Sequence, residues 1–252
     1  MYDVLGMIVG FAGVYAPRYW AYCDGQQVSA ASDPAYVKLV GDTFGGDGAN
    51  NAATPNLANF PTRNKAPVRK IINVNGSFFP YVYYSTMASV LQAVAPQRMT
   101  EGGNWLECMG QSLDAGSNRQ LYSVVQNLYG GQPGQTFDIP DVSPDPTLDG
   151  SRSFEYLMCA KGAYPGTSAT YAFVGQVQYS ASLLLSDGWA RCNGSERLVS
   201  QSLPLFNVIG SRYGGDGRTT FNLPNLLPVP SKNGGILYPI ICTDGIYPPY
   251  PE

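Results

Sequence analysis

The sequence predicts a mainly β fold with short helices and Gly-rich loops, built as three tandem repeats. The chain of 252 residues contains 29 Gly and 20 Pro, a composition typical of many short strands joined by turns. Only 13% of its residues are charged, against roughly 25% in an average globular chain. Its three tryptophans each begin the same motif, which indicates an internal repeat.

The repeat is defined by fixed spacings from each tryptophan. W-x-x-C-x-G comes first, a Gly-Gly pair begins 25 residues after the Trp, and a Pro stands 35 residues after it. The residues are Trp20, Cys23, Gly25, Gly45, Gly46 and Pro55; Trp105, Cys108, Gly110, Gly130, Gly131 and Pro140; and Trp189, Cys192, Gly194, Gly214, Gly215 and Pro224. We therefore expect three domains, 1–84, 85–168 and 169–252, of which the second has diverged most.

Each repeat is expected to open with a strand and to continue with one short helix. The opening strands are predicted at 7–14, 171–177 and, more weakly, 90–94. Apolar residues 16, 19 and 20 positions after each Trp have helical spacing. In the first repeat Ser32-Asp33-Pro34 is typical of a helix start, and Gly41 is typical of its end.

Each repeat is expected to close with an apolar strand that leads to a Gly, an aromatic residue and a Pro. These segments are 71–80, 157–165 and 240–248, and the insertions that distinguish the repeats fall before them. The Gly-Gly-Asp-Gly of repeats one and three indicates a turn, not a phosphate loop, because no Walker lysine follows. Repeat two has Gln132 in place of the acid, which disfavours a shared catalytic aspartate.

The composition also excludes several functions. The chain has no histidine, so Ser-His-Asp catalysis and histidine metal ligation are excluded. A net charge of −3 gives no basic face for nucleic acid. We interpret the basic cluster of Arg63, Lys65, Arg69 and Lys70 as a solvated loop that leads into a strand, with an anion site as the alternative. No segment is apolar enough for membrane insertion, and the first residues lack the basic region of a signal peptide.

The motifs resemble those of the phage tail collar family and its relatives, the microcystin-dependent proteins. The third repeat is most similar, with G-W-A-R-C-N-G at 188–194 and Y-G-G-D-G-R-T-T-F-N-L-P-N-L at 213–226. The resemblance spans nearly the whole chain. It implies a small Gly-rich β domain of tail fibres and tail tips, often trimeric, without catalysis. Some relatives hold a metal with histidines on a trimer axis. This chain has no histidine, so we expect that site to be absent here.

Three units in one chain suggest a covalent pseudo-trimer. A domain that elsewhere assembles from three chains would here close on itself, and each copy would be free to diverge. The alternative is that contacts between chains build a ring or a filament.

Tryptophans and tyrosines are the candidate contact residues. We interpret the motif tryptophans as core, with sugar stacking as the alternative, because each stands beside a Cys and a Gly. The tyrosine-rich segments are candidates for contact with a partner, since Tyr offers rigid amphipathic area. These candidates are Tyr81, Tyr83, Tyr84, Tyr247 and Tyr250.

Cysteines and carboxylates leave further alternatives open. Cys108 with Cys159, and Cys192 with Cys242, are expected to be neighbours, as disulfides or as buried thiols, and the missing signal peptide favours thiols. The acidic residues of repeat two are interpreted as a solvated loop, with a calcium site or a glycosidase pair as alternatives. They are Asp138, Asp141, Asp145 and Asp149.

Together these features predict a non-enzymatic structural or receptor-binding component of a phage tail, tail fibre or phage-derived injection device. No catalytic, cofactor-binding or metal-binding residue is assigned. The expected partners are other tail or appendage proteins in a larger oligomeric assembly and a cell-surface glycan or receptor. The expected location is the virion tail or an extracellular particle assembled in the cytoplasm. The alternative is a bacterial surface adhesin or filament subunit of the microcystin-dependent type, and a polysaccharide depolymerase is less favoured.

Overall fold

The computed structural model describes residues 4–63, 66–76, 85–94, 96–166 and 172–250. Each repeat contributes three strands to one sheet. The strands are β1 (Met7–Phe11), β2 (Trp20–Tyr22) and β5 (Arg69–Asn73); β6 (Ser89–Ala93), β7 (Trp105–Glu107) and β12 (Tyr156–Cys159); and β13 (Gln176–Ser180), β14 (Trp189–Arg191) and β18 (Ile236–Cys242). In every repeat the closing strand lies between the other two and pairs antiparallel with both. A short strand, β17 (Val229–Pro230), extends β18.

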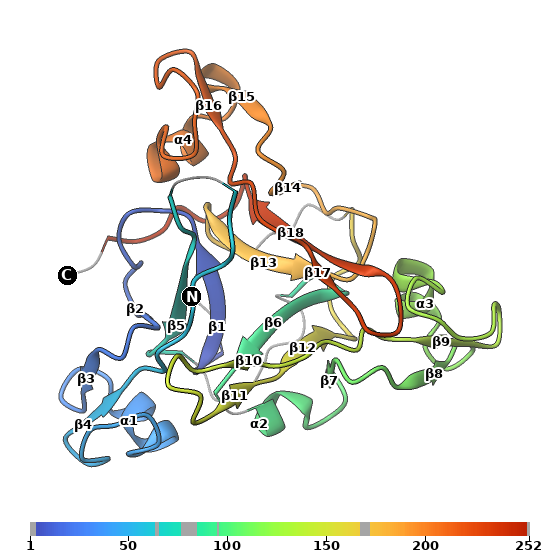
Figure 1. Cartoon of the computed structure of the whole chain (residues 1–252), viewed down its shortest axis with the longest axis horizontal. Coiled ribbons are helices and arrows are strands. Elements are labelled where there is room, and N and C mark those ends of the chain that lie inside the picture. Colours follow the sequence, from blue (N-terminus) through green and yellow to red (C-terminus); the bar gives the residue numbers. More distant parts are fainter. Residues whose placement is uncertain (1–3, 64–65, 77–84, 95, 167–171, 251–252) are drawn as a thin grey trace.

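The three opening strands, β1, β6 and β13, pair with one another in a closed ring (Figure 1). The last two residues of each strand lie opposite the first two of the next, in an antiparallel register. Gly10 and Phe11 face Val177 and Gln176, Tyr179 and Ser180 face Val90 and Ser89, and Gln92 and Ala93 face Ile8 and Met7. This cyclic register is the one expected of a single-chain pseudo-trimer, and we call the ring the hub.

A lobe projects from each corner of the hub (Figure 1). It consists of a two-stranded sheet and one short helix. The lobes contain β3 (Gln27–Ser29), α1 (Pro34–Val40) and β4 (Asn51–Ala53); β8 (Ser112–Asp114), α3 (Arg119–Val125) and β9 (Thr136–Asp138); and β15 (Glu196–Leu198), η2 (Val199–Gln201), α4 (Leu203–Ile209) and β16 (Thr220–Asn222). The second repeat also has α2 (Pro96–Thr100) and a hairpin of β10 (Asp145–Pro146) and β11 (Ser153–Phe154).

The predicted helix of the first repeat is confirmed at both ends. Pro34 is its first residue, where a missing N–H costs no helical hydrogen bond, and Gly41 ends it with a φ of +58°. In the third repeat Gly210 ends α4 in the same way, with a φ of +56°. The helix of the second repeat ends at Gln126, which adopts a φ of +52° although it carries a side chain.

The Gly-Gly pair is required by a turn that brings two segments of backbone together in each lobe. Both glycines have positive φ in every repeat. A Cβ on the second glycine would lie 2.7 Å from the Asn51 carbonyl oxygen in the first repeat and 2.6 Å from the Thr220 carbonyl oxygen in the third. A side chain on the second glycine would therefore push this turn away from the second strand of the lobe hairpin.

Several predicted strand bounds were wrong. The opening strand of the third repeat was expected at 171–177 but lies at Gln176–Ser180, because Gly175 turns the chain at a φ of +86°. The closing strands end at 73, 159 and 242, earlier than expected. In repeats two and three the chain then passes close to the segment that precedes the opening strand. A Cβ on Gly162 would lie 2.2 Å from the Ser85 carbonyl oxygen, and one on Gly245 would lie 2.3 Å from that of Ala172.

The core runs through the hub and outward into the lobes. Its largest cluster unites residues of all three repeats, among them Phe11, Val90, Leu157, Val177 and Ile241. A second cluster fills the first lobe and includes Phe154 of the second repeat. The repeats therefore share one interior and do not fold as separate beads.

The closed hub predicts that the isolated chain is a monomer, because its three opening strands already pair with one another. Light scattering or native mass spectrometry should give the mass of one chain, 27.1 kDa. A stable trimer near three times that mass at micromolar concentration would contradict the pseudo-trimer.

Candidate functional site

The repeats are held together at three seams by a contact that recurs around the hub. The residue after the motif proline, which is Asn56, Asp141 or Asn225, offers its main-chain carbonyl to the neighbouring repeat. The donors are the N–H groups of Leu148, Lys232 and Arg63, at N–O distances of 2.9, 2.9 and 2.7 Å respectively. Each donor lies in the insertion before a closing strand. We call these contacts the clasps and name the seams 1–2, 2–3 and 3–1 by their repeats.

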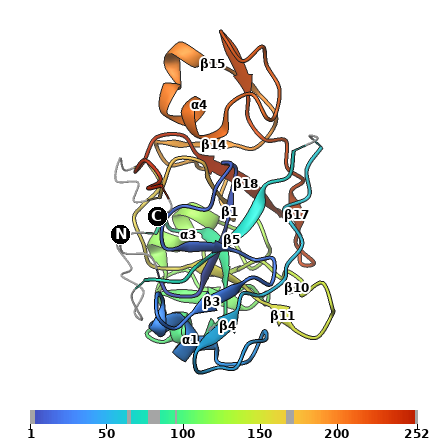
Figure 2. The same cartoon turned by 90° about the vertical axis from the view of Figure 1, so that its left-hand side faces the viewer.

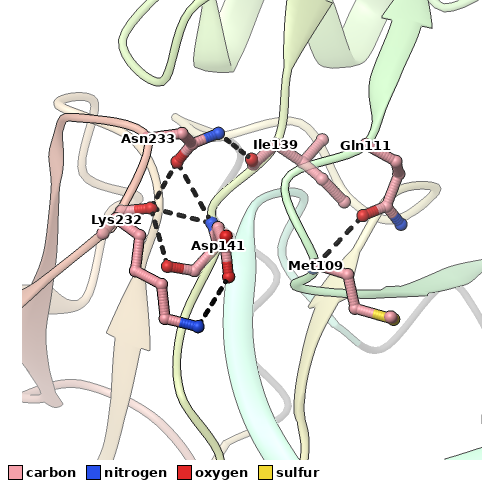
Figure 3. Close-up of polar contacts among 7 residues, drawn as sticks. Met109, Gln111, Ile139, Asp141, Lys232 and Asn233 are labelled. Carbon is pink, nitrogen blue, oxygen red and sulfur yellow. Dashed lines mark hydrogen bonds and ion pairs between the residues drawn. The ribbon is translucent and has the colours of Figure 1, made fainter.

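At seam 2–3 side chains reinforce the clasp (Figure 3). The N–H of Asp141 donates to the Ser231 hydroxyl at 2.7 Å, and the Lys232 ammonium lies 3.2 Å from the Asp141 carboxylate. The amide of Asn233 donates to the carbonyl oxygen of Ile139 at 2.9 Å. Figure 2 shows that β17 lies on the same side of the molecule as β10 and β11, the strands of the insertion that forms the clasp of seam 1–2.

Two seams are further closed by a buried tyrosine, the residue before the Gly-Gly pair. The Tyr129 hydroxyl reaches the carbonyl oxygens of Ala181 and Ile236, at 3.2 and 3.0 Å. The Tyr213 hydroxyl lies 3.0 Å from the carbonyl oxygen of Ala12 and 3.5 Å from that of Pro67. The third equivalent, at seam 1–2, is Phe44, which has no hydroxyl and is only partly buried.

Seam 1–2 contains a groove of about 570 Å³ beside Phe44. It is lined by Thr43 and Phe44 of the first repeat and, from the second repeat, by 93–94, 96–97, Glu107 and 151–155. The Phe44 ring stacks on Phe154 with centroids 5.7 Å apart, and the Arg152 guanidinium donates to the Thr43 carbonyl at 3.2 Å. The groove is thus a preformed hollow with an aromatic wall and a charged rim.

A buried ion pair also joins the first two repeats. The Lys70 ammonium, only 5% exposed, contacts the Asp145 carboxylate and lies 3.0 Å from the side-chain oxygen of Gln92. Tyr156 donates its hydroxyl to the same carboxylate at 3.0 Å, and burial raises the pKa of this tyrosine. The solvated-loop prediction was therefore wrong for Lys70 and incomplete for Asp145, because β5 carries Lys70 into the hub.

The rest of the basic cluster is dispersed. Arg69 lies over the Tyr22 ring and 3.5 Å from the Asp24 carboxylate. Arg63 donates its N–H in the clasp of seam 3–1, and Lys65 lies outside the described residues. These side chains do not converge on one point in the part of the chain that the structure describes.

The structure separates the four carboxylates of the second repeat. Asp138 packs beside Gly130, Asp141 belongs to a clasp, and Asp145 pairs with Lys70. Hydrogen bonds from Thr147 and Ser151 lower the pKa of Asp149 to about 2. Within the described residues no three acidic, cysteine or histidine side chains come together as metal ligands.

The turn aspartates of repeats one and three act within their own lobes. One carboxylate oxygen of Asp216 accepts the N–H groups of Arg218, Thr219 and Thr220, each at 2.8 Å. Asp47 accepts three N–H groups of its own turn in the same way. Hydrogen bonds lower the pKa of both carboxyls. The Thr219 hydroxyl contributes most at Asp216 and the Asn50 amide at Asp47, followed by the backbone N–H groups of each turn.

The motif tryptophans and cysteines lie in the interior. Trp20, Trp105 and Trp189 are 5%, 1% and 8% exposed. All five cysteines are free and buried, and burial raises their pKa. The favoured alternative of buried thiols is therefore confirmed. The strand register places Cys159 opposite Trp105 and Cys242 opposite Trp189, and not opposite Cys108 and Cys192. The motif cysteine instead fixes backbone: in each repeat its carbonyl accepts the N–H of Leu57, Val142 or Leu226.

The tyrosine candidates fall into two groups. Tyr81, Tyr83 and Tyr84 lie outside the described residues. Tyr250, 67% exposed, stacks on Tyr15 with centroids 4.9 Å apart, so the carboxyl end packs against the first repeat. Burial, followed by the hydrogen bond with Tyr250, raises the pKa of Tyr15 to about 12. Tyr247 is 43% exposed, and its role in partner contact stays a prediction.

The comparison with protein families agrees with this threefold plan. The model of the phage tail collar domain matches three segments of the chain, residues 6–60, 86–144 and 175–228. The chain belongs to the phage tail collar domain family. Collar domains are structural parts of phage tail assemblies, so this chain is a structural tail component, which is consistent with other tail proteins as partners. No curated protein and no solved structure gives a significant match.

Each collar match ends three or four residues after the carbonyl residue of a clasp, at 60, 144 and 228. The donor residues Arg63, Leu148 and Lys232 therefore lie outside the three matches. In the described part of the chain, no helix is long and apolar enough to cross a membrane. The clasps were not predicted from the sequence, although their acceptor residues recur at a fixed spacing. Asn56, Asp141 and Asn225 all stand 36 residues after a Trp.

Replacing the seam tyrosines should weaken the collar hub. Tyr129→Phe and Tyr213→Phe each remove a hydroxyl that donates to main-chain carbonyls at a seam, and we expect each to cost about 1–2 kcal/mol of unfolding free energy. Urea denaturation followed by tryptophan fluorescence measures this. Tyr19→Phe, on a ring that is 38% exposed, is the control and should change stability little. Equal effects of all three variants would contradict a seam role.

Breaking the buried pair should cost more. Asp145→Asn leaves the Lys70 ammonium buried without a countercharge, and we expect a loss of about 2–3 kcal/mol, below the 3–5 typical of fully buried pairs because Asp145 is 34% exposed. Lys70→Met added to it should recover part of the loss. The exposed pair is the control: Lys232→Met should cost about 1 kcal/mol or less. An Asp145→Asn effect no larger than this control would refute the assignment.

Proposed function

We propose that this chain is a non-enzymatic receptor-binding component of a phage tail, in which one chain supplies a threefold hub and three different lobes contact the cell surface. The observation that carries the proposal is the closed ring of opening strands. Because the strands pair within the chain, all three lobes are held at fixed positions around one axis (Figure 1). A rigid display of several binding faces raises avidity without a new contact.

The lobe surfaces are suited to recognition that depends little on salt. All three residues of β15 are exposed, and Leu198 and Leu203 on the third lobe are 46% and 52% exposed. The low charge content leaves hydrogen bonds and apolar contact as the main source of affinity. The lobes also differ in sequence, which supports different contacts at each corner.

Binding of the labelled protein to intact host bacteria tests the proposal. We expect saturable binding that changes less than about twofold between 50 and 500 mM salt, because few charges are involved. Leu198→Glu on the third lobe should reduce it, whereas Leu148→Glu, on a leucine of the insertion before β12 that is more exposed (63% against 46%), should not.

Failure to bind any cell while the protein is incorporated into particles would overturn the receptor role and leave a purely structural one. Immunogold microscopy gives the location. Gold at one end of tailed particles is expected, and gold along cell surfaces would favour the adhesin alternative.

A further inference from the structure

The seam between the first two repeats differs from the other two in a way that points to a ligand. At seams 2–3 and 3–1 a tyrosine hydroxyl lies between two main-chain carbonyl groups, those of Ala181 and Ile236 or of Ala12 and Pro67. By the strand register, Val94 of the second repeat corresponds to Ala12 and Ala181, and Ser153 corresponds to Pro67 and Ile236. Both line the groove at seam 1–2, and the residue that faces them is Phe44.

Phe44 therefore brings no hydroxyl to the position that Tyr129 and Tyr213 occupy at the other seams, and the space beside it is a groove instead of a filled contact. Its volume of about 570 Å³ lies within the range of roughly 300–1,000 Å³ for small-molecule sites. The helix α2, which has no counterpart in the described parts of the other two repeats, adds Pro96 and Gln97 to the wall. The groove thus results from two departures from threefold symmetry at one place.

The lining offers both kinds of hydrogen-bonding group next to an aromatic ring. Arg152 and Gln97 supply donors, whereas Glu107 and Glu155 supply carboxylate acceptors. Phe44 stacks on the buried Phe154, and Arg152 is held by its bond to the Thr43 carbonyl, so the site is largely preorganised. Because the charges nearly balance, an anionic polymer is not favoured.

We propose that this groove binds a neutral saccharide, whose hydroxyl groups take the place that the tyrosine hydroxyl has at the other seams. Its ring would lie beside Phe44 and the Arg152 guanidinium, which lies 5.9 Å from the centroid of the Phe44 ring. A sugar combines hydroxyl donors and acceptors with an apolar ring face, which is the combination that the lining complements. The proposal rests on the proposed receptor role and assigns it a site on the hub, in addition to the lobes.

Saturation-transfer NMR with the full chain tests the site directly. The probes are maltose, lactose and N,N′-diacetylchitobiose, one disaccharide each of glucose, galactose plus glucose, and N-acetylglucosamine. We expect transfer to at least one of them. Arg152→Ala should weaken its binding about tenfold, and Ser153→Trp, which fills the groove, should abolish it. Phe44→Tyr should also weaken binding, because it supplies the missing hydroxyl.

Arg218→Ala, on an exposed arginine of the third lobe, is the matched control and should leave binding unchanged. Unfolding midpoints of all variants show whether the fold persists, and Phe44→Tyr serves as the test if Ser153→Trp fails to fold. No transfer to any disaccharide, or undiminished transfer in folded Arg152→Ala and Phe44→Tyr variants, would overturn the proposal. Cell binding measured in parallel separates the two proposals: if cells are bound but the disaccharides are not, the receptor role stands and this site falls.

Discussion

The cyclic pairing of β1, β6 and β13 is the constraint on which the rest of this structure depends. A strand with open edges exposes unpaired N–H and C=O groups, and a sheet closed on itself removes that liability. Here each opening strand has only five residues, so it gives two residues to each neighbouring repeat. One repeat alone would leave these groups unpaired, which is why the three repeats share a core and form one cooperative unit.

The clasps add a second ring of contacts that is independent of side-chain identity. The three acceptors are main-chain carbonyls of Asn56, Asp141 and Asn225, and the three donors are main-chain N–H groups. Backbone contacts of this kind tolerate divergence, since any residue except proline can donate. This explains how the insertions before the closing strands can differ in length and sequence while each still holds the neighbouring repeat.

Much of the fold could be predicted because its signals are local and repeated. The Pro34 start and Gly41 end of α1, and the Gly-Gly turns, follow from backbone conformations that few residues adopt. The domain limits at 84 and 168 stay predictions. The seams could not be predicted, since the partner of Lys70 is Asp145, 75 residues away, and no local pattern links a buried lysine to it. The buried thiols could be predicted, but the residues opposite Cys159 and Cys242 could not, because equal spacing in sequence does not give the strand register.

A covalent trimer differs from a trimer of identical chains in one physical respect: its three seams are free to become unequal. In a homotrimer, a Tyr-to-Phe change at the seam would remove the hydroxyl from all three contacts at once and weaken the whole hub. Here Phe44 opens one seam while Tyr129 and Tyr213 keep the other two closed. The buried Lys70–Asp145 pair lies in the same region and holds the first two repeats together where the tyrosine contact is missing. Fusion of the repeats thus allows a groove to form within the hub without the loss of stability that three grooves would bring.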